Sequence, residues 1–360
     1  MNIAIMSPRV HTLQHRVRGS GFYIENLKNA LLKYDKKNNY IFSDEGKGLS
    51  SDVDLIHYPY FEPFFLTLPI FSSIGRSAFG GKKRKTVVTV HDLIPLVFPK
   101  YFPRGLRGNL KWQIQKMALK GSGAIITDSQ SSKTDILKFV GVRKDKVHAV
   151  YLAAGEQFKR LKTEDLGTKN NELRTKYKIP EKFVLYVGDV TWNKNLPRLV
   201  EAIKKINIPL VLVGKALVQT GFDRSNPWNQ DLDKVQKLTE SDGLFIRLGF
   251  VDNKDLVSLY NLATLFVMPS LYEGFGLPVL EAMSCGCPVV TSKEGSLAEV
   301  AEDAVHYIDP YDINSIANGI GEIYFNTDVA KELSQKGLTQ AKKFSWEKTA
   351  KETIKVYESV

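Results

Sequence analysis

The sequence predicts an α/β protein built from two doubly wound parallel-sheet domains that face each other across a cleft. Two observations lead to this fold class. The chain has 360 residues, which is enough for two domains of about 150 residues each. In both halves, short apolar runs typical of buried strands alternate with segments of helical periodicity. Such alternation is typical of parallel sheets covered by helices on both faces.

The composition is that of an ordinary globular protein, with 43% hydrophobic and 25% charged residues. No apolar run approaches the roughly 20 residues that span a bilayer, and the N-terminal residues lack the pattern of a secretion signal. Cys285 and Cys287 are the only cysteines, too few for a disulfide framework, so we expect a cytoplasmic protein. No neighbouring His or Cys completes a zinc site with them, and both are expected to be packing residues.

Positive charge is concentrated in the first half of the chain. Residues 1–165 contain 27 Lys and Arg and 14 Asp and Glu, whereas residues 166–360 contain 23 and 25. This asymmetry indicates an anionic partner for the first half, either nucleic acid or the inner face of an anionic membrane. The basic residues are scattered and no RNA- or DNA-binding motif is present, so we expect no nucleic acid partner.

The most informative stretch, residues 264–292, is predicted to form a strand, a glycine turn and a helix. An apolar run at 265–268 precedes a polar turn that contains Gly274 and Gly276, and Pro278 suits the first turn of a helix because it has no N–H group. The free N–H groups and the positive end of the helix dipole make such a turn an anion site, most often for phosphate.

Two carboxylates flank this turn, Glu273 within it and Glu281 in what we expect to be the first helical turn. Carboxylates repel phosphate and accept hydrogen bonds, so sugar hydroxyls are their natural partners. N–H groups that bind phosphate, placed between two carboxylates that bind sugar hydroxyls, match a nucleotide sugar. The alternative is that Glu281 complements the helix dipole and the glycines only shape the turn.

Glu273 and Glu281 are separated by seven residues, which matches the E-x7-E signature of retaining GT-B glycosyltransferases of family 4. Residues 269–290 (PSLYEGFGLPVLEAMSCGCPVV) resemble that family closely. The resemblance covers nearly the whole chain and is strongest in the second half. It implies a GT-B fold whose C-terminal domain binds the nucleotide sugar, with Glu281 on the ribose and Glu273 as a catalytic residue on the transferred sugar. The donor-binding residues that it implies are Gly19, Gly21, Gly188, Lys194, Gly249, Phe250, Glu273, Gly274, Phe275, Gly276, Leu277 and Glu281.

The N-terminal turn is a second candidate anion site. A basic glycine turn at residues 16–21 follows an expected strand at 2–6 and leads into a helix. Its spacing is not that of a dinucleotide-binding loop. Residues 19–31 (GSGFYIENLKNAL) resemble the family's N-terminal loop, which implies that Gly19 and Gly21 approach the donor phosphates and the acceptor.

His91 follows an expected strand at 86–90, at the carboxyl end where α/β sheets place ligands. A single His is often structural, but VTVHDLIPLVFP resembles the family segment whose His lies over the donor sugar. The resemblance therefore implies that His91 is catalytic and that Asp92 lies near the acceptor. The turn DSQSSKTDI resembles the family's strand-to-helix turn that lines the cleft, and it adds Ser129 as an acceptor residue.

Lys194 stands just before an expected helix in the turn that follows Gly188. A lysine here is commonly exposed, but the resemblance makes it a catalytic ligand of the diphosphate. Many family members carry an additional Arg in this turn, where this chain has Asp189 and Asn193. The second phosphate contact is therefore expected from elsewhere, either Arg18 or backbone N–H groups.

Three segments of the first half are candidate lipid-facing surfaces. The aromatic and proline-rich residues 60–71 fit either a packed loop or a lipid- or acceptor-facing surface. The basic run 81–85 fits a solvated loop or contact with acidic headgroups. The helix expected at 106–119 is amphipathic and basic, which fits either core packing or peripheral membrane contact.

The domain boundary is expected in residues 161–171, which are polar and aperiodic and therefore read as a linker. This gives an N-terminal acceptor-binding domain over 1–165 and a C-terminal nucleotide-sugar-binding domain over 166–344. The C-terminal helix, 345–360, resembles the family's closing helix and is expected to pack back on the first domain.

These expectations combine into a retaining, metal-independent hexosyltransferase of the mannose or glucose type. It would use a nucleoside diphosphate sugar, preferably GDP-mannose, and a hydroxyl of a glycan or lipid-linked acceptor in cell-surface polysaccharide synthesis. Glycosidase chemistry, which also uses two carboxylates, is set aside because Glu281 is expected to point at the nucleotide. No D-x-D motif stands in the expected cleft turns, so no metal is expected. The alternatives are a nucleotide-sugar epimerase of the same fold or a non-catalytic sugar-nucleotide-binding module.

Overall fold

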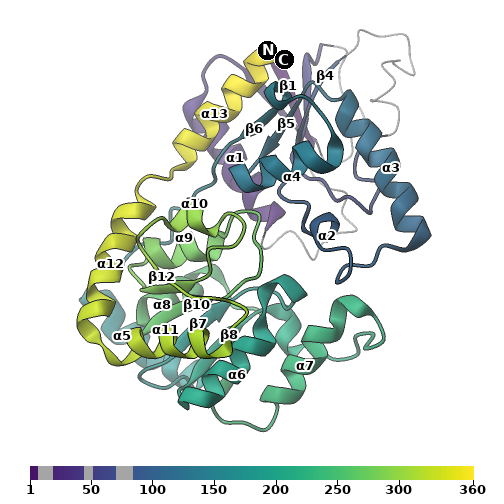
Figure 1. Cartoon of the computed structure of the whole chain (residues 1–360). Coiled ribbons are helices and arrows are strands. Elements are labelled where there is room, and N and C mark those ends of the chain that lie inside the picture. The colour runs from purple at the N-terminus through teal and green to yellow at the C-terminus, as the bar shows by residue number, and fades with distance from the viewer. Residues whose placement is uncertain (7–18, 44–51, 70–83) are drawn as a thin grey trace. The chain divides into compact units, whose positions relative to one another are not determined.

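The computed structural model describes residues 1–6, 19–43, 52–69 and 84–360 (Figure 1). The chain forms two compact units. The first unit contains Met1–Leu152 and Phe344–Val360, and the second contains Ala153–Lys343. Three sequence features lie wholly or partly outside the described residues: Arg18 with the start of the basic glycine turn, the last residues of the aromatic segment, and most of the basic run at 81–85.

The first unit is a six-stranded parallel sheet with the strand order β2-β1-β3-β4-β5-β6. The strands are β1 (Asn2–Met6), β2 (Asn39–Ser43), β3 (Leu55–Tyr58), β4 (Lys85–Thr89), β5 (Ala124–Thr127) and β6 (Val147–Ala149). The helices are α1 (Ser20–Tyr34), α2 (Ile94–Val97), α3 (Gly105–Gly121), α4 (Gln130–Val140) and α13 (Trp346–Ser359). Helix α13 packs against α1, and α3 packs against α4.

The second unit is another six-stranded parallel sheet, with the order β12-β11-β10-β7-β8-β9. The strands are β7 (Val184–Val187), β8 (Leu210–Val213), β9 (Phe245–Arg247), β10 (Leu265–Met268), β11 (Val289–Thr291) and β12 (His306–Tyr307). The helices are α5 (Thr163–Tyr177), α6 (Leu196–Ile206), α7 (Gln230–Thr239), α8 (Asn253–Leu262), α9 (Leu277–Ser284), α10 (Leu297–Ala301), α11 (Ile313–Phe325) and α12 (Thr327–Ala341).

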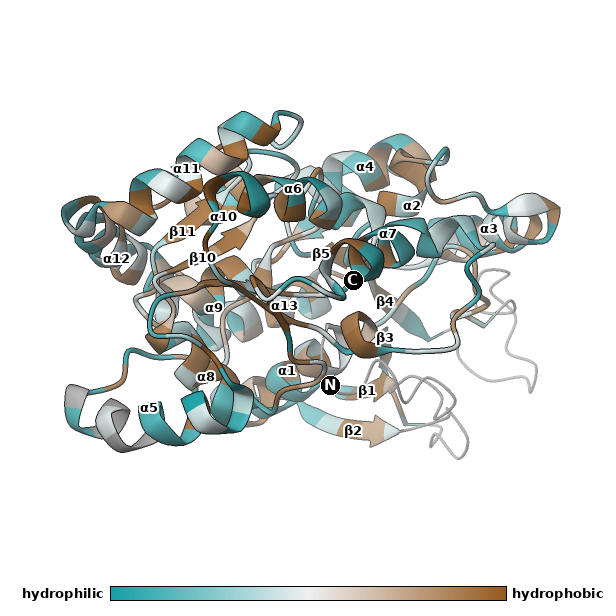
Figure 2. Ribbon diagram, turned by 90° about the horizontal axis from the view of Figure 1, so that it is seen from below, coloured by the Kyte–Doolittle hydropathy of each residue, from teal (hydrophilic) through white to brown (hydrophobic). Residues whose placement is uncertain are grey.

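The central strands of the second sheet are continuous apolar runs, as expected of strands that helices cover on both faces. Every residue of β7, β8 and β10 is buried, and Figure 2 shows β10 and β11 as hydrophobic ribbons among helices of mixed hydropathy. Right-handed crossovers place α6 and α7 on one face of the second sheet and α8 and α9 on the other. The predicted doubly wound α/β class is confirmed in each unit.

The linker expected at residues 161–171 is wrong. Helix α5 begins at Thr163 and continues to Tyr177, packing against α8. The helix has few apolar residues, of which Leu173 is buried, and its last turn is held by polar contacts, since Lys176 and Tyr177 both bond the Asp255 carboxylate at 2.6 and 2.7 Å. The chain passes from one compact unit to the other after Leu152, before this helix.

Among the described residues, none of the helices combines the length and the apolar character that crossing a membrane requires.

Candidate active site

The second sheet has a topological switch point between β7 and β10. The chain leaves β7 toward β8 on one side and later returns to β10 on the other. Two helices that start from neighbouring strands then diverge to opposite faces, and ligands of open α/β sheets bind at the carboxyl ends of such strands. The loops that follow β7 and β10 contain Lys194 and Glu273, two of the three predicted catalytic residues.

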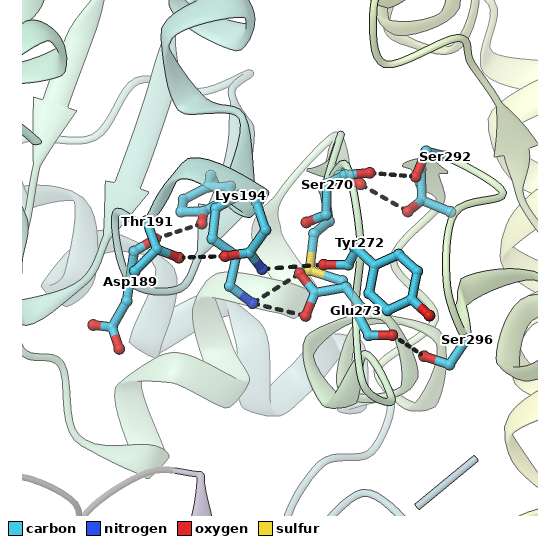
Figure 3. Close-up of polar contacts among 12 residues, drawn as sticks. Asp189, Thr191, Lys194, Ser270, Tyr272, Glu273, Ser292 and Ser296 are labelled. Atoms are coloured by element: carbon cyan, nitrogen blue, oxygen red, sulfur yellow. Dashed lines mark hydrogen bonds and ion pairs between the residues drawn. The ribbon is translucent and has the colours of Figure 1, made fainter. Parts of the chain in front are cut away.

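Lys194 and Glu273 meet at this point. The Lys194 Nζ atom lies 2.8 Å from both carboxylate oxygens of Glu273 (Figure 3). The side chains are only 20% and 8% exposed. Charges this far from water need partners, so the pair places a cation beside an anion at the edge of the sheet. Chemically, a cation can bind a phosphate and a carboxylate can accept hydrogen bonds from hydroxyl groups.

Two asparagines fix the backbone around the pair. Asn193 accepts a hydrogen bond from Thr191 at 2.7 Å and donates one to the Tyr272 carbonyl at 3.0 Å (Figure 3). Asn195 has φ +60°, which starts α6 from a left-handed residue, and its amide donates to the Pro269 carbonyl at 3.0 Å. The two loops are therefore tied together before any ligand arrives. In the sequence, Asn193 was notable only as a position at which the family resemblance led us to expect an arginine.

A third loop, after β11, holds the backbone of Glu273 and was not predicted as part of the site. Ser296 donates to the Glu273 carbonyl at 3.0 Å from its hydroxyl and at 3.2 Å from its backbone N–H. Gly295 has φ +64°, and a Cβ atom there would lie 2.5 Å from the same carbonyl. Ser292 donates to the Ser270 carbonyl at 2.6 Å (Figure 3). Only β11 lying beside β10 brings these residues together.

The glycine turn before α9 has the predicted geometry. Gly276 caps the helix at φ +97°, and it has no side chain with which to bond the first amides. Leu277 is the first helical residue, Phe275 is buried and Gly274 precedes it in the turn. The backbone amides and the helix dipole at this end are suited to an anion.

The expected position of Glu281 in the first helical turn is wrong. Helix α9 begins at Leu277 and has no acidic residue in its first turn, so Glu281 lies one turn further on. The dipole effect falls off within the first turn, which also weakens the alternative that Glu281 only complements the dipole. Its carboxylate accepts a hydrogen bond from the Tyr260 hydroxyl of α8 at 3.1 Å.

The other predicted donor residues of the second unit line the ends of β7, β8 and β9. The Gly188 N–H donates to the Val213 carbonyl, and the Gly214 N–H donates to the Gly249 carbonyl, both at 2.9 Å. A Cβ atom on Gly214 would meet the Gly188 carbonyl at 2.1 Å, so these turns approach as only glycine allows. Phe250 is exposed next to Gly249. Asp189, one of the two positions at which the resemblance led us to expect an arginine, turns its carboxylate away from Lys194 (Figure 3).

In the first unit, His91 pairs with Asp128, a residue that the sequence analysis did not select. They follow the neighbouring strands β4 and β5, and His91 Nδ1 lies 2.7 Å from the Asp128 carboxylate. Because an ionised carboxylate only accepts, the proton sits on Nδ1 and the other ring nitrogen, Nε2, faces away. Nε2 is buried and makes no hydrogen bond of normal geometry among the described residues, but the Pro59 backbone is close enough to contribute to the raised pKa of His91.

The electrostatics of His91 follow from these neighbours. Burial lowers the pKa of His91, but the Asp128 charge and hydrogen bond, helped by Asp92, outweigh burial and raise the pKa above its ordinary value. Asp92 itself bonds the Ile94 N–H at 3.0 Å. Ser129 caps α4 by accepting from the Ser132 N–H at 3.0 Å, so each of these two predicted acceptor residues has a local structural contact.

A network of buried polar side chains, which we call the His57 network, packs against His91. The His57 ring bonds the Tyr357 hydroxyl of α13 at 2.7 Å and the Thr89 hydroxyl at 2.8 Å. Thr89 also bonds Tyr23, whose ring meets His91 edge-on at 4.9 Å. Burial, together with the nearby His91, lowers the pKa of His57 to about 3, so its ring stays neutral.

The remaining predictions concern glycines, cysteines and metal. Gly19, at φ +67°, caps α1, and Gly21 lies in its first turn. Cys285 and Cys287 are buried, and burial raises the pKa of both thiols, which fits packing residues. Over residues 1–6, 19–43, 52–69 and 84–360, no three His, Cys, Asp or Glu side chains gather as a metal site would need.

Comparison with known sequences places both halves in one class. Residues 169–340 match the family described as "Glycosyl transferases group 1", and residues 11–153 match "Glycosyltransferase Family 4". The "Serotype-specific mannosyltransferase WbdA" of Escherichia coli is 33% identical over 279 residues, which cover 74% of this chain and 32% of WbdA. The chain thus spans about a third of that relative. The "O-antigen chain mannosyltransferase B" of Escherichia coli is 32% identical over 281 residues, covering 76% of this chain and 70% of the relative.

Solved structures agree on the fold. Anabaena Alr3699/HepE in complex with UDP-glucose aligns with a TM-score of 0.73 at 18% identity, over 100% of both chains. A sucrose-phosphate synthase from Thermosynechococcus elongatus aligns with a TM-score of 0.73 at 20% identity, over 99% of this chain and 98% of that one. These likenesses confirm the predicted GT-B fold. With the two family matches and the mannosyltransferase relatives, they show that the chain belongs to glycosyltransferase family 4.

Proposed function

We propose that this protein transfers a hexose from a nucleoside diphosphate sugar to a hydroxyl of a glycan or lipid-linked acceptor in cell-surface polysaccharide synthesis. The observation that carries the proposal is the Lys194–Glu273 pair at the switch point of the second sheet, beside an uncapped helix N-terminus. A cation, free amides and a carboxylate in one place match a diphosphate joined to a sugar.

The leaving group is the diphosphate, and its negative charge grows as the glycosidic bond breaks. Lys194 and the amides of Gly276 and Leu277 are proposed to receive that charge. Because Asn193 and Asn195 already fix these loops, the donors need no rearrangement during the reaction, which is what makes such stabilisation effective.

The carboxylates are proposed to orient the donor. Glu273, held through its own carbonyl by Ser296, accepts hydrogen bonds from hydroxyls of the transferred sugar. Glu281 accepts from the ribose hydroxyls, and the Tyr260 hydroxyl bonded to it limits the rotation of its carboxylate. Gly249 and Phe250 are proposed to contact the base.

His91 is the proposed catalytic group of the first unit. With Nδ1 held by Asp128, its Nε2 atom is directed to a partner outside that pair, proposed here to be a hydroxyl of the transferred sugar. Asp92 and Ser129 are proposed to lie near the acceptor.

The reaction is proposed to retain the anomeric configuration. The bond between the anomeric carbon and the phosphate oxygen breaks, and the new bond to the acceptor oxygen forms on the same face of the sugar. The departing phosphate takes the proton of the acceptor hydroxyl. No step uses a metal ion, so activity is expected to persist in EDTA.

The donor is proposed to be GDP-mannose. Two mannosyltransferases among the relatives support mannose, whereas HepE, solved with UDP-glucose, makes UDP-glucose the competing candidate. A thermal-shift screen of nucleotide sugars, followed by calorimetry, tests this choice. Tighter binding of UDP-glucose than of GDP-mannose would replace mannose with glucose.

The activity itself is tested by incubating the protein with the preferred donor and glycan acceptors and determining the product anomer by NMR. An α-linked product from an α-linked donor supports retention. Conversion of the donor to an epimeric sugar without any acceptor would instead identify an epimerase. Donor binding with neither transfer nor hydrolysis on any acceptor would leave a binding module.

A further inference from the structure

Large apolar side chains are unevenly distributed over the surface of the described residues. Half of the twelve exposed large hydrophobic residues in that part of the chain fall between positions 65 and 117. They are Phe65, Leu66, Tyr101, Leu106, Leu110 and Met117. All belong to the first unit and lie on, or next to, α3.

Helix α3 has a packed side and an apolar exposed side. Trp112, Gln115 and Leu119 are buried on the packed side. Leu106, Leu110 and Met117 are 91%, 64% and 63% exposed. Positions four and seven apart lie on one face of a helix, so these three side chains form a single outward stripe. Figure 2 shows hydrophobic and hydrophilic segments alternating along α3.

The loop that contains Phe65 and Leu66 is anchored to the same helix. The buried Gln115 side chain accepts hydrogen bonds from the N–H groups of Thr67 and Leu68 at 3.1 and 2.8 Å. The Lys111 ammonium lies 5.7 Å from the centre of the Phe65 ring. We name the five residues Phe65, Leu66, Leu106, Leu110 and Met117 the α3 patch.

The charged residues along α3 and its flanking segments are all basic, and the carboxylate nearest to Phe65 in the chain is that of Glu62. Between Asp92 and Asp128 the sequence contains no Asp or Glu and six basic residues, namely Lys100, Arg104, Arg107, Lys111, Lys116 and Lys120. An apolar stripe bordered by long basic side chains matches a bilayer surface, where acyl chains lie below anionic headgroups. A nucleic acid would gain nothing from three exposed apolar side chains. Two copies of this patch would repel each other, because both are basic.

We infer that the α3 patch docks the protein on an anionic phospholipid bilayer, with Leu106, Leu110 and Met117 entering the headgroup boundary and the surrounding Lys and Arg contacting phosphates. This inference concerns the first unit alone and does not depend on the proposed activity.

The test is co-sedimentation of the full chain with vesicles of phosphatidylcholine, with and without phosphatidylglycerol. The protein should bind only the anionic vesicles, and binding should weaken as NaCl rises because exposed charges are screened. The variant Leu106→Gln, Leu110→Gln, Met117→Gln should lower the partition coefficient about tenfold or more. Reversing Arg107 and Lys111 to Glu should have a similar effect.

Matched controls lie on the second unit. Phe325→Gln removes an exposed apolar side chain elsewhere, and Lys331→Glu with Lys342→Glu makes the same change in net charge. Both controls should bind vesicles as the parent does, and all variants should keep the parent's melting temperature and nucleotide affinity. Equal binding by the patch variants, binding to neutral vesicles, or no binding at all overturns the inference. A patch variant that changes the oligomeric state, measured by light scattering, without affecting vesicle binding identifies the surface as a protein interface instead.

Discussion

The two units share one winding plan but organise their polar residues differently. In the second unit, a fully charged pair, Lys194 and Glu273, stands at the switch point of the sheet and is fixed by backbone contacts from three loops. In the first unit, the His91–Asp128 pair stands over β4 and β5 and rests on neutral buried groups, among them His57 and Tyr357. The first unit carries a net charge of +13 and the second −2. The same fold therefore presents an ion pair in one unit and a histidine–carboxylate pair in the other.

The largest expected effect tests the charged pair of the second unit. Lys194→Ala should lower kcat/KM by about 10²–10³, because it removes a positive charge from the leaving group. It should also destabilise the second unit by about 1–3 kcal/mol, since a buried carboxylate loses its partner. Steady-state kinetics and urea unfolding measure the two effects.

A paired variant separates these roles. Lys194→Met with Glu273→Gln removes both charges and should restore much of the lost stability while activity stays low. Recovery of activity in the double variant would show that the pair is only structural.

The titratable pair of the first unit is tested by Asp128→Asn. Without the Asp128 charge, the His91 pKa should fall, and kcat should drop about tenfold to a hundredfold because the ring loses its fixed tautomer. NMR titration of the His91 ring reports the pKa directly, and the limb of the pH–rate profile that reports His91 should move to lower pH. Asp145→Asn, at an exposed position, is the control. An unchanged His91 pKa would contradict the assignment.

The buried, neutral His57 predicts that the stability of the first unit is more sensitive to acid than that of the second unit. The folded-state pKa of His57, about 3, lies below the ordinary 6.5, so between these values the unfolded chain binds a proton that the folded unit does not. The contribution of His57 to the free energy of unfolding of the first unit should therefore be complete above about pH 6.5. It should be lost as the pH decreases toward 3. Hydrogen exchange at several pH values measures this in each unit.

The variant His57→Gln provides the control for that experiment. It should be less stable at neutral pH, because the bonds to Tyr357 and Thr89 are disturbed, but its stability should depend less on pH. The second unit contains a single histidine, His306, which lies partly exposed. Equal acid sensitivity of the two units would refute the comparison.

The smallest expected effect concerns the proposed ribose contact. Glu281→Gln should raise the Kd for the nucleoside diphosphate about fivefold to tenfold, and Tyr260→Phe about threefold, since each removes a hydrogen bond worth about 1 kcal/mol. Calorimetry measures both. Unchanged affinity in the two variants would show that the ribose does not bind at Glu281.

The sequence predicted the features that are local in the chain. The strand, glycine turn and helix around Gly276 lie where residues 264–292 place them, because periodicity, glycine and proline act over a few residues. Lys194 and Glu273 could be selected separately from the family resemblance. Their contact at 2.8 Å depends on β7 lying beside β10, and strand order is not written in either segment.

The partners that were missed share this cause. Asp128 meets His91 only because β5 neighbours β4, and Ser296 reaches Glu273 only because β11 neighbours β10. Helix α5 was missed for a different reason, since it has few apolar residues and polar bonds to Asp255 help to hold its end. A sequence reader could have flagged Asp128 and Ser296 as polar residues following apolar runs, but not paired them.

Helix α13 has a consequence for the order in which the molecule is completed. Its residues leave the ribosome after the second unit, yet Tyr357 bonds His57 and Thr349 bonds the Tyr151 carbonyl, both in the part of the first unit that precedes the second unit in the chain. The first unit therefore cannot form the hydrogen bond between His57 and Tyr357 until the whole second unit has been synthesised. A chain truncated after residue 343 and released should already protect the second unit from protease while the first remains open to cleavage.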